Sequence, residues 1–288
     1  MNTSIYWIFS FLFCSLICHG QDPSEAYYIS TSSTGGKYNI DNIELISSFN
    51  KGGYNNQPFY VGSELYLACS RGSFIRNNTD LVKLDLQKRQ LKYLTNTGEQ
   101  EFSPSVFNGK IFFVKLDKKN QHQELWSLER GQIKRVIQYS NIAYYQIIDQ
   151  ENIALVLLED NQLNLYLYNT LNESKKLISR DVGRSIHLQD SDHLMFVHKY
   201  SNEYWHLKKY SIRSGRVAIV QKTIQESEDF CIGDNDIIWM GKGSKIFSLN
   251  LNTPTPEWQM AMDLEKFNLT NIKRLATNNN NQFVVINQ

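Results

Sequence analysis

The chain has 288 residues and a formal net charge of only +1 at pH 7. A nucleic-acid-binding surface needs a basic patch, so this balance argues against a nucleic-acid partner. Hydrophobic residues make up 41% of the chain and aromatic residues 12%, a composition that suits stacked β-sheets with interleaved rings.

Residues 1–20 have the pattern of an export signal. The run from Ile5 to Cys18 is almost entirely apolar, and it is too short to span a bilayer comfortably. Small residues stand three and one positions before Gln21, so we expect cleavage before Gln21. Lipid attachment at Cys14 or Cys18 is a less favoured alternative, because a large apolar residue precedes each cysteine. We therefore predict a periplasmic or secreted protein with no transmembrane span in the mature chain.

A stretch of roughly 43 residues recurs along the rest of the chain, a period typical of propeller blades. The clearest copy begins at Glu101 and contains four short apolar segments, separated by turn residues such as Asn108-Gly109 and Gly131. Four short strands between such turns predict one antiparallel blade. The second strand of each copy begins at an apolar residue: Leu65, Ile111, Ile153, Leu194, Ile237 and Phe283.

The sixth copy is divided between the two ends of the sequence. Only two strands fit between residue 272 and Gln288, while residues 27–30 and 43–46 read as a third and fourth strand with nothing before them. Joining the ends completes the blade and pairs its open edges. An open β-sandwich is the alternative fold, but it would not explain why the two fragments are complementary.

We therefore predict an all-β protein, a six-bladed β-propeller with four-stranded antiparallel blades. Its last blade is closed by N- and C-terminal strands, an arrangement known as Velcro closure. We expect a single domain over residues 21–288 and a monomer. The expected blades cover residues 52–96, 97–139, 140–181, 182–224 and 225–265, with a composite blade of residues 266–288 and 25–50.

The segment Leu94-Thr95-Asn96-Thr97-Gly98-Glu99-Gln100-Glu101-Phe102-Ser103-Pro104 resembles the junction between blades in TolB-like propellers, the family of WD40-like repeats called PD40. In that family Leu-Thr closes one blade, an acidic loop follows, and Ser-Pro opens the next. The segments from Gly53 to Pro58 and from Asp80 to Leu86 are also similar to the family pattern. The likeness covers roughly residues 50–137. It implies protein-interaction or scaffold work in the cell envelope, and it implies no reaction.

Propellers usually bind at one end of the channel, on the loops that enter the innermost strands. Alignment of the repeats on Ser103 gives the equivalent positions as Gln57, Tyr145, Ile186, Asp229 and Leu275, with further polar residues beside them on the same loops. Tyrosines mixed with both signs of charge suit a protein or peptide partner. The candidate binding residues at the channel mouth are Tyr54, Gln57, Glu99, Glu101, Ser103, Tyr144, Tyr145, Arg184, Asp229 and Lys273. Solvation of the channel mouth is an equally good explanation of these residues.

Two sequence patterns suggest metal ions, but each has a simpler explanation. Asp190-Ser191-Asp192 and Asp234-Asn235-Asp236 fall where the repeat has a hairpin turn, and Asp and Asn are favoured in turns. His198 and His206 are expected to face each other across a hairpin centred on Asn202, but a zinc site needs further ligands, so a structural or pH-sensitive pair is favoured. We therefore predict no metal and no cofactor.

The two cysteines of the mature chain, Cys69 and Cys231, fall in blades that are not neighbours in the ring. A disulfide between them is therefore not expected, and both should be buried thiols that behave as small hydrophobic side chains.

No catalytic motif is present: the sequence has no Gly-x-Ser-x-Gly elbow, and we predict no catalytic residue and no enzyme. The favoured function is an exported TolB-like propeller that acts as a non-enzymatic protein-interaction or scaffold module, with a protein or peptide partner in the cell envelope. The alternative is a six-bladed-propeller enzyme or small-ligand binder, lactonase-like or carbohydrate-active, with a metal in the channel held by Asp229 and Gln57.

Overall fold

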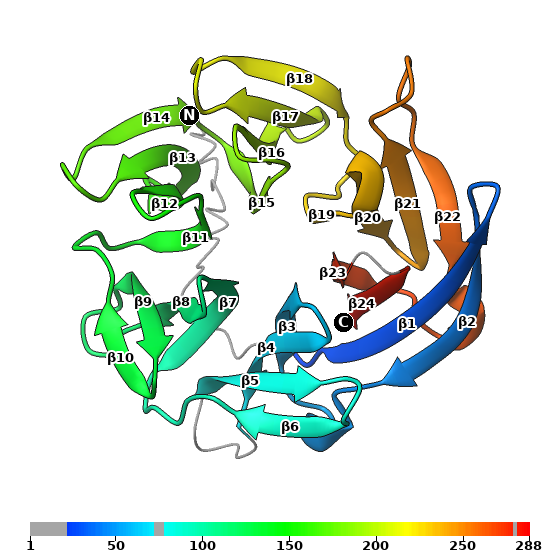
Figure 1. The fold of residues 1–288 in the computed structure, drawn as a ribbon, viewed down its shortest axis with the longest axis horizontal. Coiled ribbons are helices and arrows are strands. Elements are labelled where there is room, and N and C mark those ends of the chain that lie inside the picture. The colour runs from blue at the N-terminus through cyan, green and yellow to red at the C-terminus, as the bar shows by residue number, and fades with distance from the viewer. Residues whose placement is uncertain (1–21, 72–77, 279–280) are drawn as a thin grey trace, which may run out of the picture.

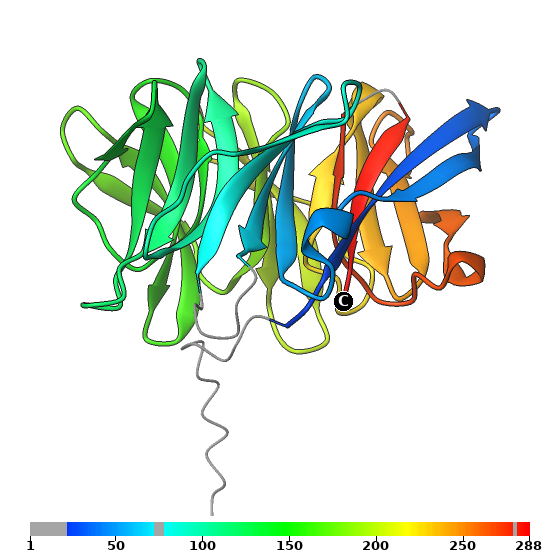
Figure 2. The ribbon, with the colours of Figure 1, turned by 90° about the horizontal axis from the view of Figure 1, so that it is seen from below.

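Six four-stranded blades stand around a central channel in the computed structural model, which describes residues 22–71, 78–278 and 281–288 (Figure 1). Seen edge-on, the ring is flat, and the strands run between its two faces (Figure 2). The predicted export signal and the predicted cleavage before Gln21 lie outside the described residues. The predicted fold class, an all-β six-bladed propeller, is confirmed.

Five blades are continuous in sequence, and each runs antiparallel from the channel outward. Blade 1 consists of β3 (Asn55–Val61), β4 (Glu64–Ser70), β5 (Thr79–Asp85) and β6 (Gln90–Tyr93). Blade 2 consists of β7 (Gln100–Phe107), β8 (Lys110–Leu116), β9 (Gln123–Glu129) and β10 (Gln132–Arg135). Blade 3 consists of β11 (Ile142–Ile147), β12 (Asn152–Glu159), β13 (Gln162–Asn169) and β14 (Lys175–Ser179). Blade 4 consists of β15 (Val182–Leu188), β16 (His193–Lys199), β17 (Trp205–Ser211) and β18 (Val217–Lys222). Blade 5 consists of β19 (Phe230–Ile232), β20 (Ile237–Lys242), β21 (Lys245–Asn250) and β22 (Gln259–Asp263).

Blade 6 is built from both ends of the described chain. Its strand order is β2-β1-β24-β23, which combines β1 (Glu25–Thr34) and β2 (Lys37–Leu45) with β23 (Ile272–Thr277) and β24 (Gln282–Asn287). Antiparallel pairing sets Ile29 opposite Phe283, so the earliest and latest strands lie side by side (Figure 1). This pairing is the predicted Velcro closure.

The hydrophobic core is divided into layers between neighbouring blades, because each sheet buries both of its faces. In the layer between blades 5 and 6, the ring of Trp239 meets the rings of Tyr38 and Phe283 edge to face, with centroids 4.9 and 4.8 Å apart. Edge-to-face pairs add about 0.5–1.5 kcal/mol to the burial of the rings. Blades 1 and 2 are also joined by a parallel bridge between Thr79 and Gln100.

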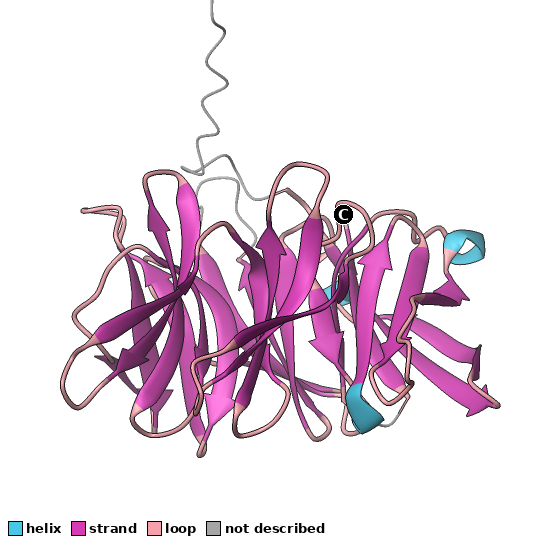
Figure 3. Ribbon diagram, turned by 90° about the horizontal axis from the view of Figure 1, so that it is seen from above, coloured by secondary structure: helices cyan, strands magenta, loops and turns pink. Residues whose placement is uncertain are grey.

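Regular helices are almost absent from the described residues. Three single 3₁₀ turns lie in connecting segments (Figure 3): η1 (Ser48–Asn50), η2 (Asp234–Asp236) and η3 (Glu265–Phe267). Among the described residues, no helix has the length and apolar character needed to cross a membrane.

Irregular pairing interrupts five of the six innermost strands where they line the channel. In β3 and β7 the interruption falls at Gln57-Pro58 and Ser103-Pro104, where proline has no N–H to donate. Gln57 and Ser103 both adopt left-handed backbone conformations, with φ of 57° and 51°. Such bulges re-aim side chains, so they change which residues face the channel.

Candidate functional site

The channel contains a small cavity of about 110 Å³, lined mainly by residues of the innermost strands. We call the end of the ring at which the innermost strands begin the mouth face. The cavity is lined by residues from all six blades, which include Gln57, Ser103, Tyr144, Arg184, Asp229 and Arg274. A site at this position is therefore shared by the whole ring.

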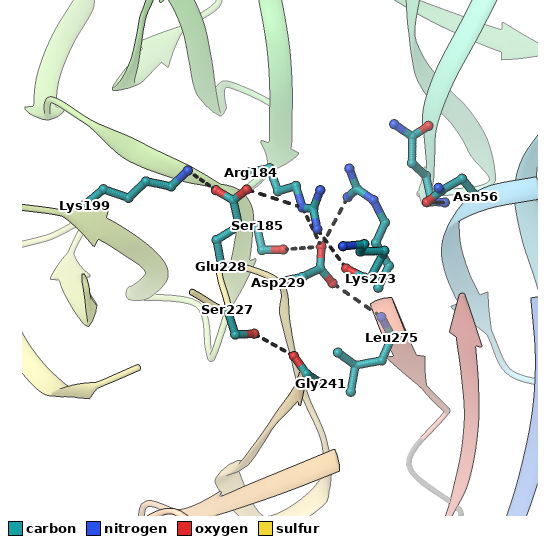
Figure 4. A network of polar contacts seen from close by, with 12 residues as sticks. Asn56, Arg184, Ser185, Lys199, Ser227, Glu228, Asp229, Gly241, Lys273 and Leu275 are labelled. Atoms are coloured by element: carbon teal, nitrogen blue, oxygen red, sulfur yellow. Dashed lines mark hydrogen bonds and ion pairs between the residues drawn. The ribbon is translucent and has the colours of Figure 1, made fainter. Parts of the chain in front are cut away.

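The carboxylate of Asp229 lies at the centre of a polar network in this cavity (Figure 4). Its Oδ2 atom is 3.3 Å from Nη1 of Arg274 and 3.5 Å from Nε of Arg184. Ser185 donates its hydroxyl to the same oxygen at 3.1 Å, and the backbone N–H of Leu275 lies 3.4 Å from Oδ1. Asp229 lies just before the short strand β19, where its carboxylate contacts residues of both neighbouring blades. One carboxylate thus holds arginines from blades 4 and 6.

Arg274 is the most enclosed cation of the network. Burial acts to lower the pKa of its guanidinium, but Asp229 and the nearby Tyr144 and Tyr54 outweigh burial and raise the pKa. The Tyr144 ring lies 5.8 Å from the guanidinium carbon, across the channel from blade 6. Arg274 therefore stays charged inside the cavity.

Arg184 is bound from two sides and connects the cavity to the rim. Its Nη2 atom donates to the carbonyl oxygen of Lys273 at 2.8 Å, and its Nε atom lies 3.8 Å from Oε1 of Glu228. Glu228 also pairs with Lys199, at the end of β16 (Figure 4). Within the described chain, the buried Nε atom of Arg184 has no hydrogen-bond partner.

Six of the residues expected at the channel mouth line the cavity: Gln57, Ser103, Tyr144, Tyr145, Arg184 and Asp229. Three of them are tied together by hydrogen bonds between blades. The backbone N–H of Ser103 donates to Oε1 of Gln57 at 2.7 Å, and the Tyr145 hydroxyl donates to the carbonyl oxygen of Ser103 at 2.8 Å. These contacts fix the bulges of blades 1 and 2 against blade 3.

Glu101 does not face the channel, which corrects the position expected from the sequence. Its side chain is fully buried at the junction of blades 1 and 2, where its carboxylate accepts hydrogen bonds from the hydroxyls of Thr95 and Thr97, the latter at 2.9 Å. Burial raises the pKa of Glu101 to about 7, and the nearby Asp80 adds to the shift. The bulge at Ser103 breaks the alternation of side chains along β7, so Glu101 points away from the cavity.

The other three expected residues lie around the cavity. The Tyr54 ring packs edge to face on Phe102, 6.5 Å between centroids, and burial raises the pKa of its hydroxyl, which interacts electrostatically with Arg274. Glu99 accepts a hydrogen bond from the backbone N–H of Lys118 at 2.7 Å, in the loops of blade 2. Lys273 is exposed, and it contributes its carbonyl oxygen to Arg184.

Arg274 is the functional candidate that the sequence did not reveal. The spacing of the repeats matches Ser103 with Leu275, which lines the cavity, but it does not show the register shift between Ile272 and Arg274 that accompanies the entry of Arg274 beside it. The available signal was the basic pair Lys273-Arg274 at the start of a predicted innermost strand.

The two Asp-x-Asp tripeptides are turns, as predicted. Both connect an innermost strand to the second strand of its blade, and Oδ1 of Asp190 accepts the backbone N–H groups of Asp192 and His193 at 2.7 and 2.9 Å. His198 and His206 lie directly opposite each other, also as predicted. In the parts of the chain that the structure describes, no three His, Cys, Asp or Glu side chains are grouped to hold a metal ion.

Cys69 and Cys231 are both free and buried, in agreement with the sequence-based expectation. Burial raises the pKa of each thiol.

Comparisons with known proteins identify the fold. No protein-family model matches the sequence, and no curated protein matches it. Among solved structures, a putative TolB from Agrobacterium tumefaciens matches with a TM-score of 0.66 and 8% identity, over 93% of this chain and 99% of that chain. TolB from Acinetobacter baumannii matches with a TM-score of 0.55 and 15% identity, over 92% of this chain. The match spans 64% of that TolB's length.

A putative gluconolactonase matches with a TM-score of 0.55 and 10% identity, over 82% of this chain and 88% of that chain. All three identities are low, so the similarity establishes a TolB-like propeller fold. Because proteins of different kinds share this fold, the function must be argued from the site.

Proposed function

We propose that this protein is an exported, non-enzymatic interaction module that binds a protein partner through the mouth face. The observation that carries the proposal is the combination, on one face, of exposed tyrosines with a small charged cavity. The module consists of a single propeller over residues 21–288, and residues 1–20 direct its export to the periplasm or the outside of the cell. We propose that it acts as a monomer.

Exposed tyrosines lie on the hairpin between β16 and β17. Tyr200 and Tyr204 are 71% and 54% exposed, and the backbone N–H of Tyr200 donates to the carbonyl oxygen of Tyr204 at 3.0 Å. Lys199 begins this hairpin and donates its backbone N–H to the carbonyl oxygen of Asp181, just before β15, at 2.7 Å. The tyrosines therefore stand beside the start of an innermost strand. Tyrosine combines a large contact area with a small entropy cost, which is why it is enriched in protein interfaces.

The cavity is small for a metabolite. Sites for small molecules commonly enclose about 300–1,000 Å³, whereas this cavity measures about 110 Å³. Its size suits a single side chain of a larger partner better than a whole substrate.

The donors in the cavity also fit a channel metal poorly. Asp229 is held between the guanidinium groups of Arg184 and Arg274, and Oε1 of Gln57 already accepts the N–H of Ser103. Two guanidinium groups beside the carboxylate repel a divalent cation. The lactonase-like alternative, which relies on Asp229 and Gln57 as ligands, is therefore less favoured than the interaction module.

Site-specific photo-crosslinking tests the proposed function. A benzophenone amino acid is placed at Tyr204, and the protein is irradiated in a cell-envelope extract of its source organism. The matched control carries the same group at Leu171, which is 73% exposed in the turn between β13 and β14. That turn lies at the face opposite the mouth face. In it, Thr170 donates its backbone N–H to the carbonyl oxygen of Glu151, which stands in the turn where the innermost strand β11 ends and β12 begins.

We expect one adduct of defined mass from the Tyr204 position and none of that mass from Leu171. The adduct should persist in the presence of EDTA and should form again with the purified partner. Equal crosslinking at both positions, or none at either, would contradict binding at the mouth face. Loss of the adduct in EDTA would instead favour the metal-dependent alternative.

A further inference from the structure

We propose that Arg184 and Arg274 form a carboxylate-binding site in the channel, and that the carboxylate belongs to an acidic segment of the partner protein. This inference rests on the proposed function and specifies the chemistry of the ligand. The two guanidinium groups come from blades 4 and 6, and the carboxylate of Asp229 in blade 5 lies between them (Figure 4).

The site has hydrogen-bond donors to spare. Each guanidinium carries five N–H donors in a planar fork that matches a carboxylate. Asp229 and the carbonyl oxygen of Lys273 occupy only part of this capacity. The buried Nε of Arg184 makes no hydrogen bond within the described chain, because the oxygens of Asp229 and Glu228 that face it lie 3.5 and 3.8 Å away. A second carboxylate entering the cavity would accept hydrogen bonds from the remaining N–H groups of the two arginines.

The charge balance favours an anion. Two arginines and one aspartate line the cavity, while Glu228, beside Arg184, is paired with Lys199, so this network of described residues keeps one positive charge in excess. Lys273 adds a further exposed cation at the rim, and His187 adds none at neutral pH because burial lowers its pKa. An Asp or Glu side chain would neutralise the excess inside a cavity that is partly shielded from water, where charge-assisted hydrogen bonds are strongest.

The arginines are held in place before any ligand arrives. Asp229 contacts both of them, and Ser185 and the backbone of Leu275 fix Asp229 in turn. Pre-organised side chains lose little freedom on binding, so more of the interaction contributes to affinity. The surrounding tyrosines, Tyr144 inside the cavity and Tyr200 outside it, offer flat contact surfaces to the rest of the segment.

A randomised heptapeptide phage library, panned against the immobilised wild-type protein, tests the proposal. We expect the enriched peptides to carry Asp or Glu at one fixed position. The dissociation constant of one enriched synthetic peptide is then measured by isothermal titration calorimetry. Replacing its fixed acid by Asn or Gln should weaken binding to the wild-type protein at least tenfold, and this arm is independent of any change in protein folding.

Protein variants locate the site. Arg184→Gln and Arg184→Lys should each raise the dissociation constant of the acidic peptide at least tenfold. Glutamine removes the charge, and lysine keeps the charge but lacks the planar fork of N–H donors. Lys110→Gln is the control, because Lys110 is exposed at the start of β8, beyond the turn from β7, and pairs only with Glu129 in the described chain. The Lys110→Gln variant should bind the acidic peptide with the same dissociation constant as the wild-type protein.

Enrichment of peptides without an acidic residue, or an acidic peptide that binds Arg184→Gln as tightly as wild type, would overturn the inference. In either case the Tyr204 crosslink could still form, so the proposed function would survive. A library that yields no binder at all would count against the carboxylate site, and a missing Tyr204 crosslink would count against the proposed function.

Discussion

The carboxylate of Asp229 and the guanidinium of Arg274 meet at 3.3 Å across the boundary between blades 5 and 6, with both side chains largely buried. This ion pair joins a continuous blade to the composite blade that closes the ring. Removing one partner of a buried pair leaves an uncompensated charge and costs about 3–5 kcal/mol. Asp229→Asn should therefore lower the free energy of unfolding by about 3 kcal/mol, as measured by urea denaturation.

Glu226→Gln provides the comparison for that measurement. Glu226 pairs with Lys242 at 2.5 Å on the exposed surface of the same blade. Because exposed pairs contribute little, its denaturation midpoint should match the wild type. A midpoint for Asp229→Asn that also matches the wild type would show that Arg274 is not held by Asp229.

Glu101 should make the protein less stable as the pH rises. Its pKa in the folded protein is about 7, against an ordinary value of 4.5, so the folded state binds its proton more tightly than the unfolded state does. The resulting stabilisation is complete below about pH 4.5 and is lost as the pH rises to about 7, by roughly 3 kcal/mol at most. Glu101→Gln should flatten the unfolding free energy between pH 5 and pH 8. Parallel profiles for the two proteins would refute this.

The two buried thiols should be inert in the folded protein. Cys69 and Cys231 are buried, and burial raises the pKa of both, so little thiolate is present at neutral pH. A thiol reagent such as Ellman's reagent should label neither cysteine in native buffer and both in guanidinium chloride. Rapid native labelling of either one would mean that its blade opens locally.

Ile29 should be critical for ring closure. It is fully buried between blades 5 and 6 and lies opposite Phe283 in the pairing of β1 with β24. Ile29→Ala should reduce the free energy of unfolding by about 2–5 kcal/mol, measured by urea denaturation, because it leaves a cavity in a packed layer. Ile219→Ala, at a position that is 64% exposed on β18, should have almost no effect. Equal losses would show that β1 is not packed as described.

The fold was predictable because the blade repeat is carried by local patterns. The apolar residues from Leu65 to Phe283 that mark the second strands all fall within β4, β8, β12, β16, β20 and β24. The opposition of His198 and His206 also followed from simple hairpin symmetry. Strand alternation and turn residues are short-range properties, which a single sequence contains.

The site was less predictable because it depends on bulges. A bulge adds one residue to a strand, and nothing in the repeat shows where it falls. Register shifts in β23 and β7 accompany the entry of Arg274 into the channel and the turning of Glu101 away from it. Both residues stand close to positions that the repeat does place in the channel, Leu275 and Ser103. The pairing of Asp229 with two arginines is likewise a contact between blades, and the repeat within one blade does not encode it.

The composite sixth blade sets an order on folding. The hydroxyl of Thr31 in β1 donates to the carbonyl oxygen of Asn281, 250 residues further along the chain. While the intervening blades are being made, β1 has only β2 to pair with, and a lone two-stranded hairpin is marginally stable. The ring can therefore close only after β24 has been synthesised, so the slow, long-range step of folding comes after the five continuous blades have been made.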